Sequence, residues 1–250
     1  MSMPQKVTID AAGLHYTPLN EMIRAAVAEG AKEIVLNNVN GHRFIGNGLR
    51  GTDVRIIING VPGGDLGMFM SGPTCIVHAN AEHAPGNTMD AGSIYIHGDA
   101  GDAVAHSMRG GEVYVKGNIG YRGGIHMKEY QDKKPVLVVG GHARAFLGEY
   151  MAGGLLIVLG RGETCPVDER GIGTGIHGGE IYIRGEVPER HLGIGATKKP
   201  FGENDRKRIR PYIEKYCREF SIADPSLFED EYVRIGPASA RPFAGKYTWE

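Results

Sequence analysis

The chain has 250 residues, of which 39 are glycine, 41% are hydrophobic and 23% are charged, a composition that excludes disordered and collagen-like proteins. Its 28 basic and 29 acidic residues give a formal net charge of −1, which disfavours nucleic acid and anionic lipid as partners. The three cysteines are too scattered for a disulfide framework, a zinc ribbon or an iron–sulfur site. Because no segment resembles a signal peptide or a membrane span, we expect a cytoplasmic protein without membrane contact.

The first 40 residues are expected to form a small αβ cap. The stretch LNEMIRAAVAEG follows Thr17 and Pro18, so we predict a helix with Thr17 as its N-cap and Gly30 as its stop. The next segment, KEIVLNNV, is rich in aliphatic and β-branched residues and is predicted to be a strand. Residues 1–40 would then cover one end of the region that follows.

A repeat of about twenty residues occupies the middle of the chain. Seven short strands, RIIING, CIVHA, SIYIHG, EVYVKG, VLVVG, LLIVLG and EIYIRG, end at positions 60, 79, 98, 117, 140, 160 and 185. These closing positions are 19, 19, 19, 23, 20 and 25 residues apart. Intervals of 19 residues leave no room for an amphipathic helix between strands, which disfavours a doubly wound α/β domain.

The residues four and two before each closing position are apolar in all seven units. Side chains two apart lie on the same face of a strand, so these pairs are predicted to face one core. The pairs are Ile56/Ile58, Cys75/Val77, Ile94/Ile96, Val113/Val115, Val136/Val138, Leu156/Val158 and Ile181/Ile183. Glycine pairs upstream of several strands indicate bends.

No single unit can bury its aliphatic stripe, but stacked units can. We therefore predict an all-β fold, a single-stranded, right-handed parallel β-helix of about seven coils. The expected division is an αβ cap over residues 1–40, the β-helix over 41–200, and a C-terminal helix and arm over 201–250.

After Gly185 the repeat ends, and GENDRKRIRPYIEKYCREF indicates an amphipathic helix. Pro211 indicates that the regular helix begins only there. The last thirty residues contain several prolines and little periodicity, and they are interpreted as an extended arm. One face of the helix carries five apolar residues, Ile209, Tyr212, Ile213, Tyr216 and Phe220.

No catalytic, cofactor-binding or metal site is predicted in this chain. The segment 171–178 contains GxGxG, but a strand rather than a helix follows it, so it is interpreted as a coil turn and not as a nucleotide-binding loop. His78 and His97 are expected to be neighbours on the outward face without a third ligand. Cys75 aligns with the core, whereas Cys165 remains an alternative as a reactive thiol.

Apolar residues also continue along the outward face of the strands. A strip of this kind is expected to be covered by the chain's own terminal helix or by another polypeptide, and both alternatives remain open. We predict a partner interface at two places, the outward strip and the C-terminal arm. Its expected residues are Leu137, Val139, Ile157 and Leu159 in the strip, with Arg241, Phe243 and Tyr247 in the arm.

Three long runs carry a resemblance to a known family. GDAGDAVAHSMRGGEVYVKGNIGYRGGIHMKEY, VLVVGGHARAFLGEYMAGGLLIVLG and GIGTGIHGGEIYIRGE closely resemble the GXGXG domain, the β-helical C-terminal domain of the glutamate synthase large subunit. The cap, the helix after Gly202 and the closing RPFAGKYT are similar to the free-standing version of that domain. The chain also resembles the β-helical subunit of formylmethanofuran dehydrogenase and a subunit of N-methylglutamate synthase.

The resemblance implies a non-catalytic subunit that bridges a class II glutamine amidotransferase and an FMN-dependent glutamate synthase subunit. In that family the glutaminase nucleophile is an N-terminal cysteine of another domain, and this sequence begins MSMP. FMN and the iron–sulfur cluster are expected in a partner subunit, and no cofactor is expected here. An autonomous β-helix enzyme or ligand-binding protein that uses its histidines or the insertion 161–175 is the rival hypothesis, and a homo-oligomer remains an open alternative.

Overall fold

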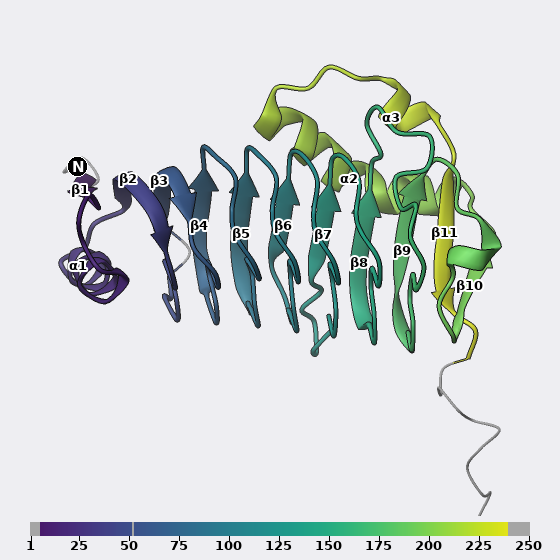
Figure 1. The fold of residues 1–250 in the computed structure, drawn as a ribbon, viewed down its shortest axis with the longest axis horizontal. Helices are drawn as coiled ribbons and strands as arrows, with labels where there is room; N and C mark the ends of the chain where they lie inside the picture. Colours follow the sequence, from purple (N-terminus) through teal and green to yellow (C-terminus); the bar gives the residue numbers. More distant parts are fainter. Residues whose placement is uncertain (1–5, 52, 240–250) are drawn as a thin grey trace, which may run out of the picture.

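The computed structural model describes residues 6–51 and 53–239, and within them one eleven-stranded sheet winds along the molecule. Strands β1 to β9 follow one another in chain order, each hydrogen-bonded in parallel to the next (Figure 1). This arrangement confirms the predicted parallel β-helix of about seven coils. The strands are β1 Lys6–Asp10, β2 Glu33–His42, β3 Arg55–Pro62, β4 Ser71–Val77, β5 Ala91–Ile96, β6 Glu112–Val115, β7 Val136–Val139, β8 Ala152–Val158 and β9 Gly178–Arg184.

The predicted inward pairs form one continuous core in six of the seven coils. Ile56 pairs with Cys75, and Cys75 with Ile94, so equivalent residues stack from coil to coil. All of these side chains are buried in the cluster that fills the column. The period-two pattern and the closing position together therefore located the core correctly.

In β7 the predicted facing is wrong by one residue. Leu137 and Val139 point into the core, whereas Val136 and Val138 lie on the outward face. The backbone N–H of Gly140 donates to Val115 O, so Gly140 takes the place before the closing position, and Gly141 is the closing residue. A one-residue slip moves every side chain to the other face, and the run VLVVGG has no polar residue that reveals the register.

Seven corners along the described chain each contain three residues with positive φ at alternate positions. In the corner 171–175 all three are glycine, yet the corner 103–107 has the same conformation with Ala, Ala and Ser. The middle position faces the core, and a Cβ added at Gly148 would lie 2.5 Å from Ile181 Cδ1. The interpretation of GxGxG as a coil turn is confirmed. The corners are 44–48, 65–69, 84–88, 103–107, 122–126, 146–150 and 171–175.

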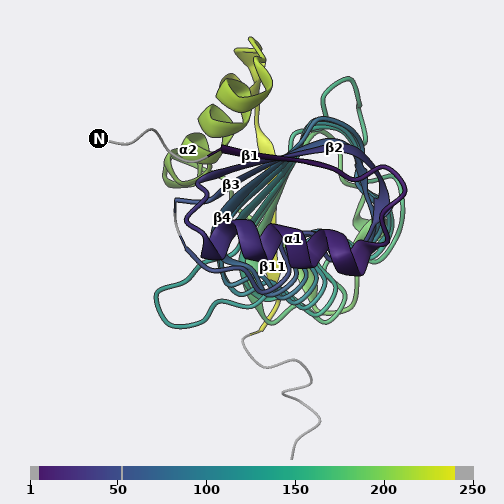
Figure 2. The same cartoon turned by 90° about the vertical axis from the view of Figure 1, so that its left-hand side faces the viewer.

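Helix α1 (Tyr16–Ala28) closes the N-terminal end of the column, and Figure 2 shows it lying across that end. Leu19 and Ile23 are buried on its inner face. The helix begins one residue before the predicted cap Thr17, because the His15 side chain accepts a hydrogen bond from the Thr17 N–H at 3.4 Å. Strand β1, which pairs with β2, was not predicted.

Helix α2 (Glu203–Phe220) packs along the outward face of the sheet (Figures 1 and 2). Its predicted apolar face is confirmed, since Ile209, Ile213, Tyr216 and Phe220 are buried against the strands. The helix does not start at Pro211 but runs through it, and this proline is exposed. The helix begins instead at Glu203, after the N-cap Gly202, whose N–H donates to the Asp205 carboxylate at 3.0 Å.

The interpretation of the last thirty residues as an arm is wrong for residues 221–239. Strand β11 (Tyr232–Pro237) pairs antiparallel with β9 and with β10 (Ala196–Lys199), so it ends the parallel stack. The short helices η1 (Glu189–His191) and α3 (Ser226–Glu229) complete this end.

Candidate functional site

The four predicted docking residues of the sheet do not form a free surface. Leu137 and Val139 lie inside the column, as the register of β7 requires. Ile157 and Leu159 do face outward, but they are fully buried in the cluster beneath α2. Of the two proposed covers, the chain's own helix therefore occupies this half of the strip. The other expected interface residues, Arg241, Phe243 and Tyr247, lie outside the described residues.

Polar contacts hold α2 in place on the sheet. Tyr216 Oη donates to the carbonyl oxygen of Lys116 at 2.8 Å, and Lys215 Nζ lies 2.5 Å from Glu112 Oε2. Burial lowers the pKa of Lys215, but its hydrogen bonds to Glu112 and Tyr95 and the charge of Glu112 together outweigh burial and leave the pKa raised. Burial, with Glu112 second, raises the pKa of Tyr114. The helix is thus an integral second layer over β4 to β9.

The outward face of β2 and β3 lies beyond the cluster under α2, whereas Ile76 of β4 is buried in that cluster. Ile57 occupies the same row as Ile157, but Ile57 and its neighbour Val35 are only half-buried and lie outside the cluster under the helix. A cleft of about 250 Å³ opens at this boundary. It is lined by Asp53, Val54, Arg55, Thr74, Ile76, Tyr95 and Glu219.

The expected histidine neighbours do meet. The rings of His78 and His97 are 5.2 Å apart, edge to face, and His97 Nε2 lies 3.8 Å from Glu219 Oε1. Burial, followed by the charge of His78, lowers the pKa of His97. Across the described part of the chain these two histidines belong to no group of three convergent metal-ligating side chains.

The corner 171–175 has no free amides with which to cradle a phosphate. The N–H groups of Gly171 and Ile172 donate to His191 O, that of Gly173 to Leu147 O, and that of Gly175 to Ile194 O. Aromatic rings cover the glycines, because a Cβ at Gly171 would lie 2.6 Å from Phe146 and one at Gly175 would lie 2.5 Å from Tyr150. The glycines provide close packing between coils.

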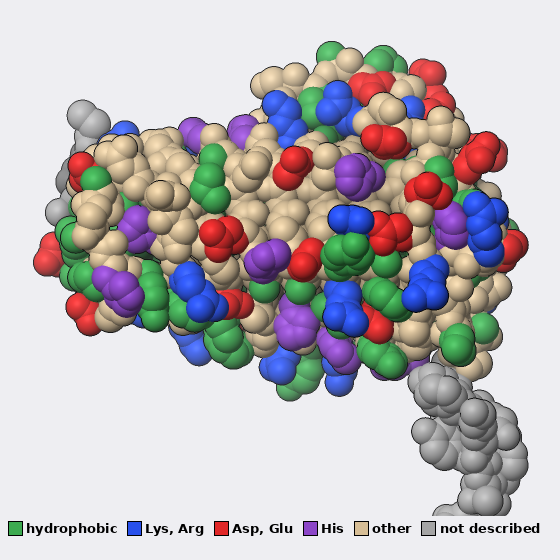
Figure 3. Space-filling view, in the orientation of Figure 1, with side chains coloured by type: hydrophobic (Ala, Val, Ile, Leu, Met, Phe, Trp, Pro, Cys, Tyr) green, Lys and Arg blue, Asp and Glu red, His purple; other side chains and the backbone are tan. Residues whose placement is uncertain are grey.

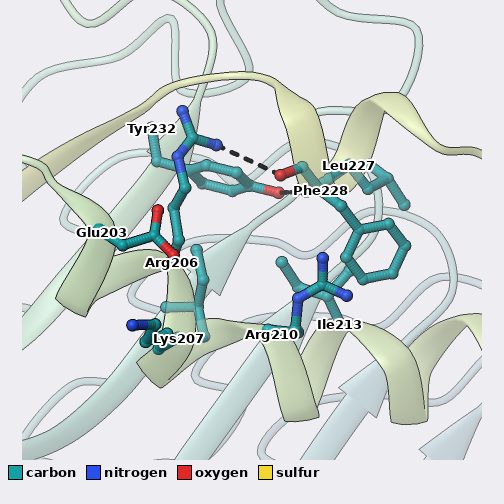
Figure 4. Close-up of a pocket in the computed structure, with 9 residues that line it drawn as sticks. Glu203, Arg206, Lys207, Arg210, Ile213, Leu227, Phe228 and Tyr232 are labelled. Carbon is teal, nitrogen blue, oxygen red and sulfur yellow. Dashed lines mark hydrogen bonds between the residues drawn. The ribbon is translucent and has the colours of Figure 1, made fainter.

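A cleft of about 160 Å³ separates α2 from α3 and β11 (Figure 4). Arg206 crosses it, and its Nη1 donates to the carbonyl oxygens of Phe228 at 3.2 Å and Asp230 at 2.8 Å. The Arg210 guanidinium lies 5.1 Å from the centre of the Phe228 ring. These contacts join α2 to α3 and the residues that follow it, so the arginines have a structural role here.

Three metal-ligating side chains converge where the insertion 161–175 meets η1. Cys165 Sγ lies 4.0 Å and His191 Nε2 3.9 Å from Asp168 Oδ1, and the ligand atoms of all three residues lie within 4.8 Å of one another. Burial, followed by the Asp168 charge, raises the pKa of Cys165. Of the three, Cys165 alone was noticed from the sequence, because His191 follows 26 positions later in a helix that no pattern indicated.

Charged and histidine side chains are scattered over the face shown in Figure 3, and they gather into no large patch of one sign on that face. Among residues 6–51 and 53–239, no helix combines the length and the hydropathy needed to cross a bilayer.

Comparisons with known proteins agree over nearly the whole chain. The family model described as the GXGXG motif matches residues 23–234. MJ1350, an uncharacterized protein of Methanocaldococcus jannaschii, is 57% identical over 253 residues, which cover 98% of this chain and 97% of that protein. A chain in the crystal structure of the formyltransferase/hydrolase complex FhcABCD from Methylorubrum extorquens, in complex with methylofuran, matches with a TM-score of 0.61 at 18% identity. That match covers 93% of this chain and 91% of the other.

Proposed function

Because this chain belongs to the GXGXG family, we propose that it is a non-catalytic structural subunit of a cytoplasmic multi-subunit enzyme complex. The observation that carries this proposal is the mutual coverage of the structural match, which spans 93% of this chain and 91% of a chain in the FhcABCD complex. The correspondence extends over nearly the whole of both chains. A shared fold alone does not fix function, so the partners are argued separately.

For the partners, we propose a complex of the glutamate synthase type. In it this chain bridges a class II glutamine amidotransferase and an FMN-dependent synthase subunit, which holds the FMN and the iron–sulfur cluster. The support is the resemblance of the three long glycine-rich runs to the glutamate synthase domain. The chemistry of Cys75 is compatible with a non-catalytic role. Burial raises the pKa of its thiol to about 12, which makes it a poor nucleophile near neutral pH.

The outward face of β2 and β3 is the proposed partner surface. It continues the apolar row that α2 covers on the later strands, and Val35 and Ile57 are its half-buried members. Interfaces gain most of their affinity from a central apolar cluster with a polar rim. Here Arg55 and Asp53 border the cleft and supply such a rim.

A second candidate is a subunit of a formylmethanofuran-type complex. The specific observation in its favour is the structural match to a chain of the formyltransferase/hydrolase complex. A subunit of N-methylglutamate synthase is a third assignment that the family resemblance allows. All three assignments give the chain a structural role. They differ in the enzyme subunits that the chain would hold together.

Co-purification from the native cell tests the proposal. The full chain carries an affinity tag and is isolated at low ionic strength, and its partners are identified and quantified by mass spectrometry. We expect an amidotransferase and a flavin-dependent synthase subunit in stoichiometric amounts. Recovery of formyltransferase/hydrolase subunits instead would select the second candidate. A chain that elutes alone and itself turns over glutamine or carries flavin would overturn the structural role.

A further inference from the structure

The Cys165, Asp168 and His191 group lies in a part of the fold where the backbone is fixed on both sides. The carbonyl oxygens that flank Cys165 are both bound, Thr164 O by Glu186 N–H at 2.8 Å and Pro166 O by Ala143 N–H at 2.9 Å. His191 O accepts hydrogen bonds from two amides of the corner 171–175. The insertion and η1 therefore present these side chains from anchored positions.

The imidazole of His191 is held in one orientation. Its Nδ1 lies 3.2 Å from the carbonyl oxygen of Val167, and because a carbonyl only accepts hydrogen bonds, Nδ1 must carry the hydrogen. In a neutral imidazole the lone pair is then on Nε2. His191 is buried, with 7% of its surface exposed, so this orientation is maintained by packing.

That lone pair faces other electron donors. Nε2 and Asp168 Oδ1 are 3.9 Å apart, and Cys165 Sγ and the same oxygen are 4.0 Å apart. The nitrogen-to-oxygen distance is too long for a hydrogen bond. Among the described residues, the Cys165 thiol makes only long hydrogen bonds, to this oxygen and, at 3.9 Å, to Val167 O. A nitrogen lone pair, a carboxylate and a sulfur that converge at such distances are best satisfied by a cation between them.

We propose that Cys165, Asp168 and His191 form a zinc-binding site with three protein ligands and one position open to solvent. Zinc is favoured because it accepts sulfur, imidazole and carboxylate ligands together, whereas magnesium and calcium prefer oxygen. The Nδ1 contact to Val167 O is the outer hydrogen bond that orients a ligating imidazole. The exposed Asp168 side chain supplies the solvent-facing side.

To fit the ion, the three ligand atoms, which lie within 4.8 Å of one another, need to draw closer together. Tetrahedral zinc with ordinary bond lengths places its ligand atoms about 3.3–3.6 Å apart, against 3.9 and 4.0 Å for the two measured pairs. On binding, the Cys165 thiol loses its proton to solvent and the sulfur lone pair forms the Zn–S bond, so one proton is released for each zinc bound. The ion would fasten the insertion to η1 beside the corner 171–175.

Metal titration of the intact chain tests this site. The purified protein is stripped with a chelator and titrated with Zn²⁺ by calorimetry in two buffers of different ionisation enthalpy, and then with Co²⁺ by absorption spectroscopy. We expect one equivalent of zinc, release of a proton, and a thiolate-to-cobalt charge-transfer band. Cys165→Ser and Asp168→Asn should each weaken binding at least about tenfold. Cys217→Ser and Asp132→Asn serve as matched controls and should leave it unchanged.

Asp168→Asn keeps the test decisive if His191→Gln disturbs folding, because the Asp168 side chain is 78% exposed. At the same zinc concentration, the melting temperature should rise more for the parent protein than for Asp168→Asn. Absence of the cobalt charge-transfer band would overturn the proposal. Equal weakening by Cys165→Ser and Cys217→Ser would overturn it as well.

Discussion

The outward face of this sheet has two halves built from the same row of apolar side chains. Over β4 to β9, α2 covers the row, and Ile157 is fully buried. Over β2 and β3 the same row carries Val35 and Ile57, which remain half-buried. The helix α2 therefore covers only part of this apolar row, and the uncovered part is the surface that we propose for a partner.

The largest effect on stability is expected when a single Asp replaces an outward isoleucine, tested separately in the covered and in the uncovered half. Ile157→Asp buries an unpaired carboxylate under α2 and should lower the free energy of unfolding by at least about 4 kcal/mol. Ile57→Asp, in the equivalent row, should cost about 1 kcal/mol because water reaches it. Urea denaturation measures both, and equal losses would contradict the division of the face.

Gly140 gives a second way to break the covered half. An added Cβ would lie 1.9 Å from Tyr216 Oη and 2.1 Å from Lys116 O, so Gly140→Ala should displace the helix and cost about 2–4 kcal/mol. The control is Gly202→Ala, where nothing lies within 4 Å of the added atom, and its effect should stay below about 1 kcal/mol. Loss of helical circular dichroism before the sheet signal would identify the helix as the part displaced.

Alkaline pH should weaken the covered half selectively. Burial raises the pKa of Tyr114 and of Tyr232 above the usual value of 10.0, so in this range the unfolded chain ionises before the folded one. Their stabilising contribution is complete below pH 10 and falls by about 1.4 kcal/mol per pH unit per tyrosine above it. Tyr114→Phe should make the fall between about pH 10 and 11 shallower. An unchanged slope would mean that this tyrosine is accessible to solvent.

The smallest effect on stability, and the most informative for function, is expected from Ile57→Lys. Stability should change by about 1 kcal/mol or less, while capture of the partner complex should weaken at least tenfold, or about 1.4 kcal/mol. Asn40→Lys adds the same charge to an exposed position of β2 and is the control. Normal capture by the Ile57 variant would move the proposed partner surface elsewhere.

Much of the fold was predictable because the determining signals are local. The alternation of apolar residues within strands and the regular position of the closing residue were enough to predict from the sequence alone that Ile56 and Ile94 face the core. The same signals failed at Leu137, since four consecutive apolar residues fit either register. Strand β11 was missed because its partner β9 lies about fifty residues away in sequence, and a short run between prolines gives no periodic signal.

The candidate sites were less predictable, because they depend on which coils stack. The outward strip was recognised as a surface that needs a cover, but the sequence could not choose between α2 and a partner. Cys165 was noticed alone, since only the return of the chain through η1 brings His191 to it. The proposed division at residues 40 and 200 stays a prediction.

The corners with three positive-φ residues have a consequence for how this molecule can vary. Their outer positions tolerate Thr88, Ser107, His126 or Tyr150 on one backbone conformation, and the His126 and Tyr150 rings stack 5.4 Å apart. Equivalent corner positions therefore repeat along the column at intervals of about 4.8 Å, the spacing of adjacent strands. The side chains at these positions can be changed one at a time, while the backbone conformation and the spacing between them stay the same.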